Sequence, residues 1–70
     1  MSKATVAKVL EISSTSPISF HDAIEKGIAR AAKTTRGITG AWVNEEKVIV
    51  EAGKITGWRV NLKITFVLED

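Results

Sequence analysis

Residues 55–68, ITGWRVNLKITFVL, alternate between apolar and polar side chains with a period of two. The even positions are Thr56, Trp58, Val60, Leu62, Ile64, Phe66 and Leu68, and most of them are large and apolar. The odd positions between them are more polar and include Arg59, Asn61 and Lys63. This pattern predicts one long β-strand with a single apolar face. Such a face needs a helix or a second sheet to cover it, and the rest of the chain must supply that cover.

A first strand is predicted at residues 6–13. Val6, Leu10 and Ile12 fall on one side of this segment, and Glu11 and Ser13 fall on the other. The following residues 13–17, SSTSP, are all turn formers, so they predict the end of the strand and a change of direction.

An amphipathic helix is predicted to start at Ser19. A serine is a favourable N-cap, and Asp22 in the first turn interacts well with the helix dipole. The apolar positions then recur at helical spacing: Phe20, Ala23, Ile24, Gly27, Ile28, Ala31 and Ala32. Lys33 and Arg36 give a basic last turn, and Gly37 is expected to end the helix.

A second strand is predicted at about residues 41–51. Its apolar positions change parity between Val43 and Val48, which predicts a β-bulge near Glu45 and Glu46. Residues 52–54, Ala-Gly-Lys, are expected to form the turn of a hairpin into the last strand, because glycine accepts the positive φ of a tight reversal.

These elements predict the α+β class, with a two-layer β-α-β-β subunit. The longest strand is placed in the centre of a three-stranded antiparallel sheet of order 1-3-2, which wraps on one helix. A chain of 70 residues buries only about 60% of its unfolded surface, and this one has no cysteine to form a disulfide. One helix leaves the other face of the sheet uncovered, so self-association is expected to cover it.

Composition excludes several classes of function. The net charge is +2, with the charges interspersed, so nucleic acid is not an expected partner. No apolar run is long enough to cross a membrane, and residues 1–8 do not resemble a signal peptide. The lack of cysteine is consistent with a cytoplasmic location. No catalytic set is recognisable and His21 is the single histidine, so an enzyme is not expected.

The uncovered face of the sheet is the predicted functional surface. If Val43 faces the helix, Trp42 and Gly40 face away from it. Burying an indole contributes roughly 4–6 kcal/mol, so either a neighbouring subunit or a flat aromatic ligand is expected on Trp42. Arg59 beside it would donate to ring carbonyl oxygens or a phosphate. Alternatively, Arg59 forms an intersubunit ion pair with a carboxylate, for which four residues are candidates: Glu45, Glu46, Glu51 and Glu69.

The chain as a whole resembles the dodecins, a family of small flavin-binding proteins. The similarity lies in the order and spacing of several segments: Lys8-Val9, Thr15-Ser16, Ala29-Arg30-Ala31, Val43 to Glu45, Leu62 to Phe66, and Leu68-Glu69. The resemblance implies that residues 1–70 are a single dodecin-like domain in a hollow homododecamer. It also implies that flavins, FMN or riboflavin, are held in pairs between tryptophans of symmetry-related subunits, for storage, sequestration or quenching.

The resemblance also suggests cofactor-binding residues. The stacking tryptophan of the family falls on Gly40, its flavin-bonding glutamine on Arg59, and a basic position near the polar tail of the flavin on Lys47. Trp42 lies two residues further, about 6.5 Å along the same strand face, where it takes over the stacking or fills the space at Gly40. Residues 52–56 with Arg59 resemble a branch of the family linked to calcium. The alternative is therefore a shell that binds no flavin and takes up calcium through ligands that the sequence does not identify.

Overall fold

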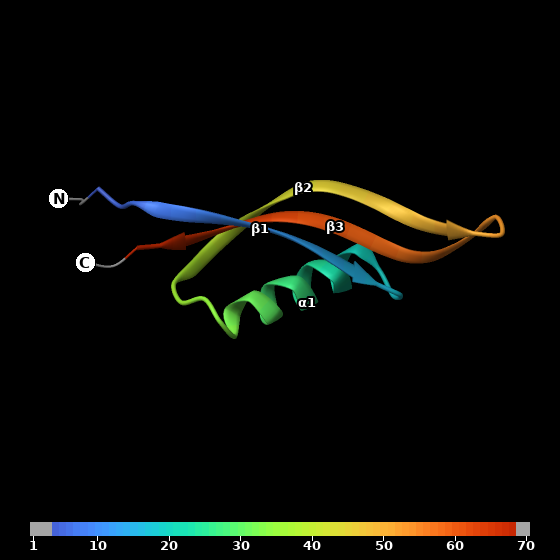
Figure 1. The fold of residues 1–70 in the computed structure, drawn as a ribbon, viewed down its shortest axis with the longest axis horizontal. Helices are drawn as coiled ribbons and strands as arrows, with labels where there is room; N and C mark the ends of the chain where they lie inside the picture. The colour runs from blue at the N-terminus through green and yellow to red at the C-terminus, as the bar shows by residue number, and fades with distance from the viewer. Residues whose placement is uncertain (1–3, 69–70) are drawn as a thin grey trace.

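The computed structural model describes residues 4–68. Its elements follow the order β1 (Ala7–Ser16), α1 (Phe20–Ala32), β2 (Ile38–Glu51) and β3 (Lys54–Val67). β3 lies between β1 and β2 and is antiparallel to both, and α1 lies across one face of this sheet (Figure 1). The predicted α+β class, β-α-β-β order and 1-3-2 sheet are confirmed.

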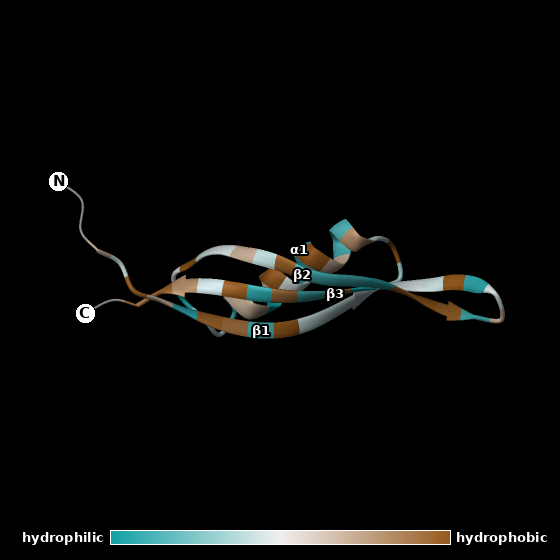
Figure 2. Ribbon diagram, turned by 90° about the horizontal axis from the view of Figure 1, so that it is seen from above, coloured by the Kyte–Doolittle hydropathy of each residue, from teal (hydrophilic) through white to brown (hydrophobic). Residues whose placement is uncertain are grey.

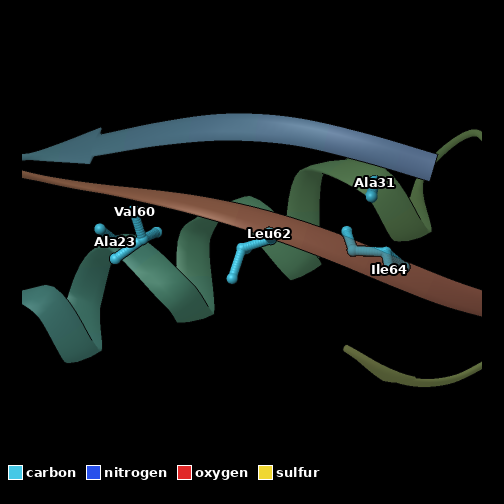
Figure 3. Close-up of a cluster of buried hydrophobic side chains, with 5 residues drawn as sticks. All are labelled: Ala23, Ala31, Val60, Leu62 and Ile64. Atoms are coloured by element: carbon cyan, nitrogen blue, oxygen red, sulfur yellow. The ribbon is translucent and has the colours of Figure 1, made fainter. Parts of the chain in front are cut away.

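The core lies between the centre of β3 and the inner side of α1. Val60, Leu62 and Ile64 have no exposed surface, and they form one cluster with Ala23 and Ala31 of the helix (Figure 3). The helix residues at this contact are small, so the helix lies close to the sheet. The alternation in residues 55–68 therefore predicted the apolar face of β3 correctly.

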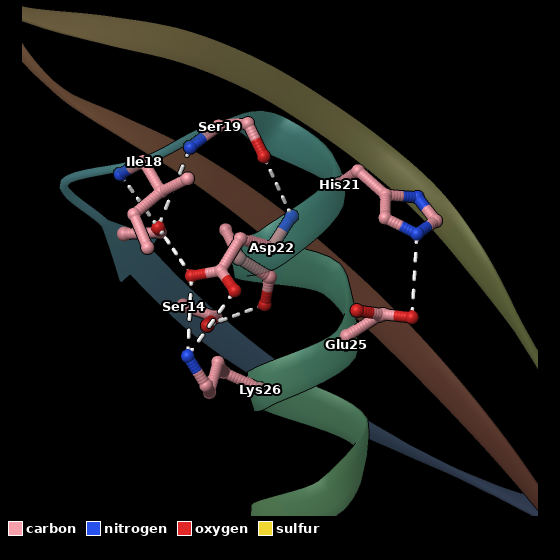
Figure 4. Close-up of polar contacts among 9 residues, drawn as sticks. Ser14, Ile18, Ser19, His21, Asp22, Glu25 and Lys26 are labelled. Carbon is pink, nitrogen blue, oxygen red and sulfur yellow. Dashed lines mark hydrogen bonds and ion pairs between the residues drawn. The ribbon is translucent and has the colours of Figure 1, made fainter.

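The helix begins where the sequence predicted. Ser19 is the N-cap, and its hydroxyl accepts a hydrogen bond of 2.9 Å from the backbone N–H of Asp22 (Figure 4). The helix ends at Ala32, with Lys33 as its C-cap, so the prediction that Gly37 ends it is wrong. Gly37 instead has a positive φ of 77° in the connection to β2, and its carbonyl accepts a hydrogen bond of 3.0 Å from the N–H of Val67.

Two predicted strand boundaries are also wrong. β1 continues to Ser16, which pairs with Trp58, although residues 13–17 were expected to be a turn. The long β3 supplies pairing partners along its whole length, and the Ser14 hydroxyl donates a bond of 2.7 Å to the carbonyl of Ala23. Tertiary pairing therefore overrides the turn preference of these residues. β2 begins at Ile38, because it pairs with Phe66 at the far end of β3.

The β2–β3 hairpin has the predicted bulge and turn. The register shifts between Val43 and Glu45, which makes Asn44 the extra residue, one position before the predicted site. Further shifts, which the sequence did not indicate, lie between Ile38 and Gly40 and between Ile49 and Val50. At the turn, Ala52 and Gly53 both have positive φ, 51° and 77°, as a two-residue type I′ hairpin requires.

The sheet is longer than the helix that covers it. The described chain measures 55 × 20 × 16 Å, and the β2–β3 hairpin extends well beyond α1 (Figure 1). Seen from above, the sheet forms a narrow twisted ribbon in which polar and apolar positions alternate (Figure 2). In the part of the chain described here, no helix has the length and hydrophobicity needed to span a membrane.

Candidate functional site

The face of the sheet opposite α1, called the open face below, is built from cross-strand rows of side chains. Residues directly opposite each other in antiparallel strands point to the same side. With β1 first, β3 second and β2 third, the rows are Val9–Thr65–Gly40, Glu11–Lys63–Trp42, Ser13–Asn61–Glu45 and Thr15–Arg59–Lys47. The sequence predictions for this surface can therefore be compared row by row.

Trp42 lies on the open face, as expected. It pairs with Lys63, whereas its neighbour Val43 pairs with the buried Leu62 on the helix side. Trp42 is 61% exposed. Gly40 lies on the same face, and a Cβ atom built there would have no atom within 4 Å. The two residues thus form an aromatic surface next to an empty position.

Arg59 and Lys47 are directly opposite each other, and both are exposed. The Nε of Arg59 donates a hydrogen bond of 2.9 Å to Oγ1 of Thr15. Arg59 is four positions from Lys63 on β3, so it lies roughly 13 Å from the Trp42 row along the strand. The expectation that Arg59 is beside Trp42 is therefore wrong within one chain.

An open hollow of about 650 Å³ lies on the Arg59 side of this face. It is lined by Ser13, Glu45, Glu46, Lys47, Arg59 and Asn61. The amide Nδ2 of Asn61 donates a bond of 2.8 Å to Oε2 of Glu11, across to β1. The hollow has polar and charged walls of both signs, while the aromatic surface lies further along the strands.

Lys63 is the neighbour of Trp42 that the sequence did not reveal. Lys63 is at an odd-numbered position, which the alternation assigned to the polar side of β3 together with Arg59 and Asn61. Its partner on β2 depends on the register, however, and the extra residue at Asn44 changes that register between the two ends of the hairpin. A sequence pattern shows that a bulge exists, but it does not give the pairing with single-residue accuracy.

Within residues 4–68, the ion pairs lie on the helix and not on the open face. His21 Nε2 is 3.3 Å from Glu25 Oε2, and Lys26 Nζ is 3.1 Å from Asp22 Oδ1. Within residues 4–68, Arg59 forms no ion pair with Glu45, Glu46 or Glu51. The expected pair was between subunits, so it stays a prediction, and Glu69 lies outside the described residues. The described part of a single chain also has no group of three or more histidine or acidic side chains that could bind a metal ion.

The chain matches known proteins over almost its whole length. The family model of dodecins matches residues 6–69. The dodecin from Streptomyces davaonensis is 31% identical, with a TM-score of 0.89, and the match covers 97% of this chain and 100% of that one. The dodecin from Streptomyces coelicolor is 30% identical, with a TM-score of 0.88 and 94% of each chain covered.

A third similar structure is the calcium dodecin from Mycobacterium tuberculosis. It is 34% identical, with a TM-score of 0.79, and 91% of each chain is covered. The comparison with curated proteins found no match. The family model and the structures agree with the β-α-β-β topology found here, and the chain belongs to the dodecin family.

Proposed function

We propose that this protein is a cytoplasmic, non-enzymatic flavin-binding protein that acts as a hollow homododecamer. Riboflavin or FMN would stack on Trp42, for storage, sequestration or quenching of the flavin. The observation that carries the proposal is the 61% exposure of Trp42 on the open face of the sheet. Neither nucleic acid nor a membrane is a proposed partner.

The exposed indole supports both parts of the proposal. An aromatic side chain of this size contributes several kcal/mol when it leaves water, so a partner is expected on it. A flat isoalloxazine ring matches an indole face in shape and stacks on it. The empty position at Gly40 leaves room beside Trp42 for the ring. The same open face is available to further copies of the chain, which would complete the cover that α1 does not provide.

Lys47 and Arg59 are proposed to bind the polar tail of the flavin. They are directly opposite each other, and like charges in this arrangement repel. An anion or a set of hydroxyl groups between them relieves the repulsion, and the guanidinium and ammonium groups are good donors to both. Because they are roughly 13 Å from Trp42 along the strand, they would serve the tail or a ring bound on another copy.

Fluorescence quenching tests the flavin proposal. Added riboflavin should lose its fluorescence on binding to the wild-type protein, because the indole quenches the stacked ring. Trp42→Ala should abolish this effect. Trp58→Phe is the matched control, since Trp58 lies on the helix side, paired with Ser16 and Val48. An absence of quenching by the wild type at micromolar concentration contradicts the proposal.

The second candidate is a shell of the same architecture that binds calcium and no flavin. The absence of a side chain at Gly40, where the resemblance places the stacking tryptophan, favours it, as does the 34% identity to the calcium dodecin. Residues 4–68 of one chain do not form a metal cluster, so the ligands would come from several copies or from residues outside that range. A melting temperature that rises with calcium and not with FMN would select this candidate.

A further inference from the structure

Trp42 has a cationic neighbour on the central strand. Lys63 is directly opposite it, and Cβ atoms in such pairs are about 4.5–5.5 Å apart. A lysine ammonium on a four-carbon stem reaches well past the edge of an indole at this separation. A ring stacked on Trp42 therefore lies within reach of the ammonium group.

Lys63 is not engaged by another charge in the described chain. Glu11 is opposite it on β1, but Oε2 of Glu11 accepts the bond from Asn61, and the ion pairs of residues 4–68 do not include Lys63. Its side chain is nevertheless only half-exposed, although it lies on the open face. Its partners in the row are Glu11 on β1 and Trp42 on β2.

We infer that Lys63 is a specificity-determining residue of the Trp42 site and donates to the carbonyl oxygens of the bound ring. This inference rests on the proposed flavin function. The isoalloxazine ring has two carbonyl oxygens on its pyrimidine side, and lysine is a donor with three N–H groups. Lys63 thus takes the role that Arg59 was expected to have, because Arg59 is too distant within the same chain.

A cation at this position also changes the properties of the ring. Reduction of a flavin adds negative charge to the pyrimidine side, and an ammonium group next to those oxygens stabilises that charge. The site is therefore expected to bind the reduced ring more tightly than the oxidised one. The class of ligand that fits best is a flat, electron-poor heterocycle with carbonyl acceptors that accepts negative charge.

Riboflavin is the suitable probe, because it has no phosphate that could attract Lys63 by itself. The experiment compares wild type, Lys63→Met and Lys63→Arg by quenching titration and by the midpoint potential of the bound riboflavin at pH 7. Lys63→Met should bind riboflavin about tenfold or more weakly, with a more negative potential, whereas Lys63→Arg should stay close to wild type. Lys8→Met is the matched control on the helix side, where Lys8 pairs with Phe66.

The outcomes separate the two proposals. If the wild type does not bind riboflavin, the flavin function fails and this inference fails with it. If the wild type binds and Lys63→Met matches it in affinity and potential, only the inference is overturned. A weaker affinity without a change of potential assigns Lys63 a purely structural role and also overturns it. If Lys63→Met does not assemble, the potential of riboflavin bound to the wild type tests the inference. A potential less negative than that of free riboflavin supports it, and an equal or more negative one overturns it.

Discussion

The hydroxyl of Ser16 donates a hydrogen bond of 2.6 Å to Oδ2 of Asp22 and so joins the end of β1 to the first turn of α1. Ser16 is only 2% exposed, and its oxygen also accepts a bond of 2.9 Å from the N–H of Ile18. The hydrogen bond from Ser16, followed by that from Lys26, lowers the pKa of the Asp22 carboxyl below its usual value. The contact between strand and helix thus favours the ionised form of this carboxyl.

Acid should weaken this connection. Because the pKa of Asp22 is lower in the folded than in the unfolded chain, the ionised carboxylate stabilises the fold at neutral pH. That contribution is lost as the pH falls below the usual carboxyl pKa and through the lowered value. Asp22→Asn should therefore melt at a lower temperature than wild type at pH 7, and the gap should narrow in strong acid. Thermal unfolding monitored by circular dichroism from pH 7 to pH 2 measures this difference in melting temperature.

Glu25→Gln is the control for this prediction, because Glu25 is on the exposed side of α1 and pairs only with His21 in the described chain. Its melting temperature should follow that of wild type across the acidic range. If the difference in melting temperature between Asp22→Asn and wild type stays constant with pH, the charge of the Asp22 carboxylate does not contribute to the stability of the fold.

Gly27→Ala should destabilise the fold. A Cβ at this helix position would lie 3.0 Å from Cβ of Ser14 and 3.1 Å from Cδ1 of Leu62, so β1 or the core must move. Overpacking of this kind costs more than the roughly 1 kcal/mol by which alanine improves the helix, and a net loss of about 1–2 kcal/mol is expected. Urea unfolding measures it. Gly40→Ala, which meets no atom within 4 Å, should show no such loss.

Ala52→Asn should stabilise the hairpin. Ala52 has a positive φ of 51°, which costs an alanine roughly 1–2 kcal/mol, and asparagine tolerates this conformation better. A gain of about 0.5–1 kcal/mol in the free energy of unfolding is expected. Gly53→Ala places a second side chain at positive φ and should destabilise by about 1 kcal/mol. Equal stability of the two variants would contradict the type I′ geometry.

Moving the indole along β2 should preserve flavin quenching. Gly40 and Trp42 share the open face, and the position at Gly40 is empty. The double variant Gly40→Trp/Trp42→Ala should therefore recover the riboflavin quenching that Trp42→Ala loses. The titration used for the single variants measures it, and a double variant as inactive as Trp42→Ala would show that the site requires the indole at position 42 itself.

The sequence was sufficient for the fold because its strongest signals are local. The alternation around Leu62 identified the central strand, and Ser19 with the apolar stripe from Phe20 to Ala32 identified the helix. The boundaries at Ser16 and Ile38 were missed, because they depend on pairing with the two ends of β3. Local preference for turns does not report such long-range contacts.

The candidate site was only partly predictable for the same reason. The alternation of side chains along the strands predicted that Trp42, Gly40 and Arg59 lie on one face of the sheet. The pairing of the strands confirms that all three lie on the open face. Which of them are neighbours depends on the register across a bulge, and Asn44 shifts it by one residue. The pairing of Trp42 with Lys63 therefore became visible only in the folded chain.

The irregular register of the β2–β3 pair has a consequence for solubility. β2 is an edge strand of 14 residues, long enough for neighbouring molecules to add strands to it in an uncontrolled way. The shifts next to Thr39 and Asn44 bend and twist that edge, so a straight strand from another molecule does not pair with it along its full length. These irregularities therefore disfavour fibril-like stacking of further strands on this edge.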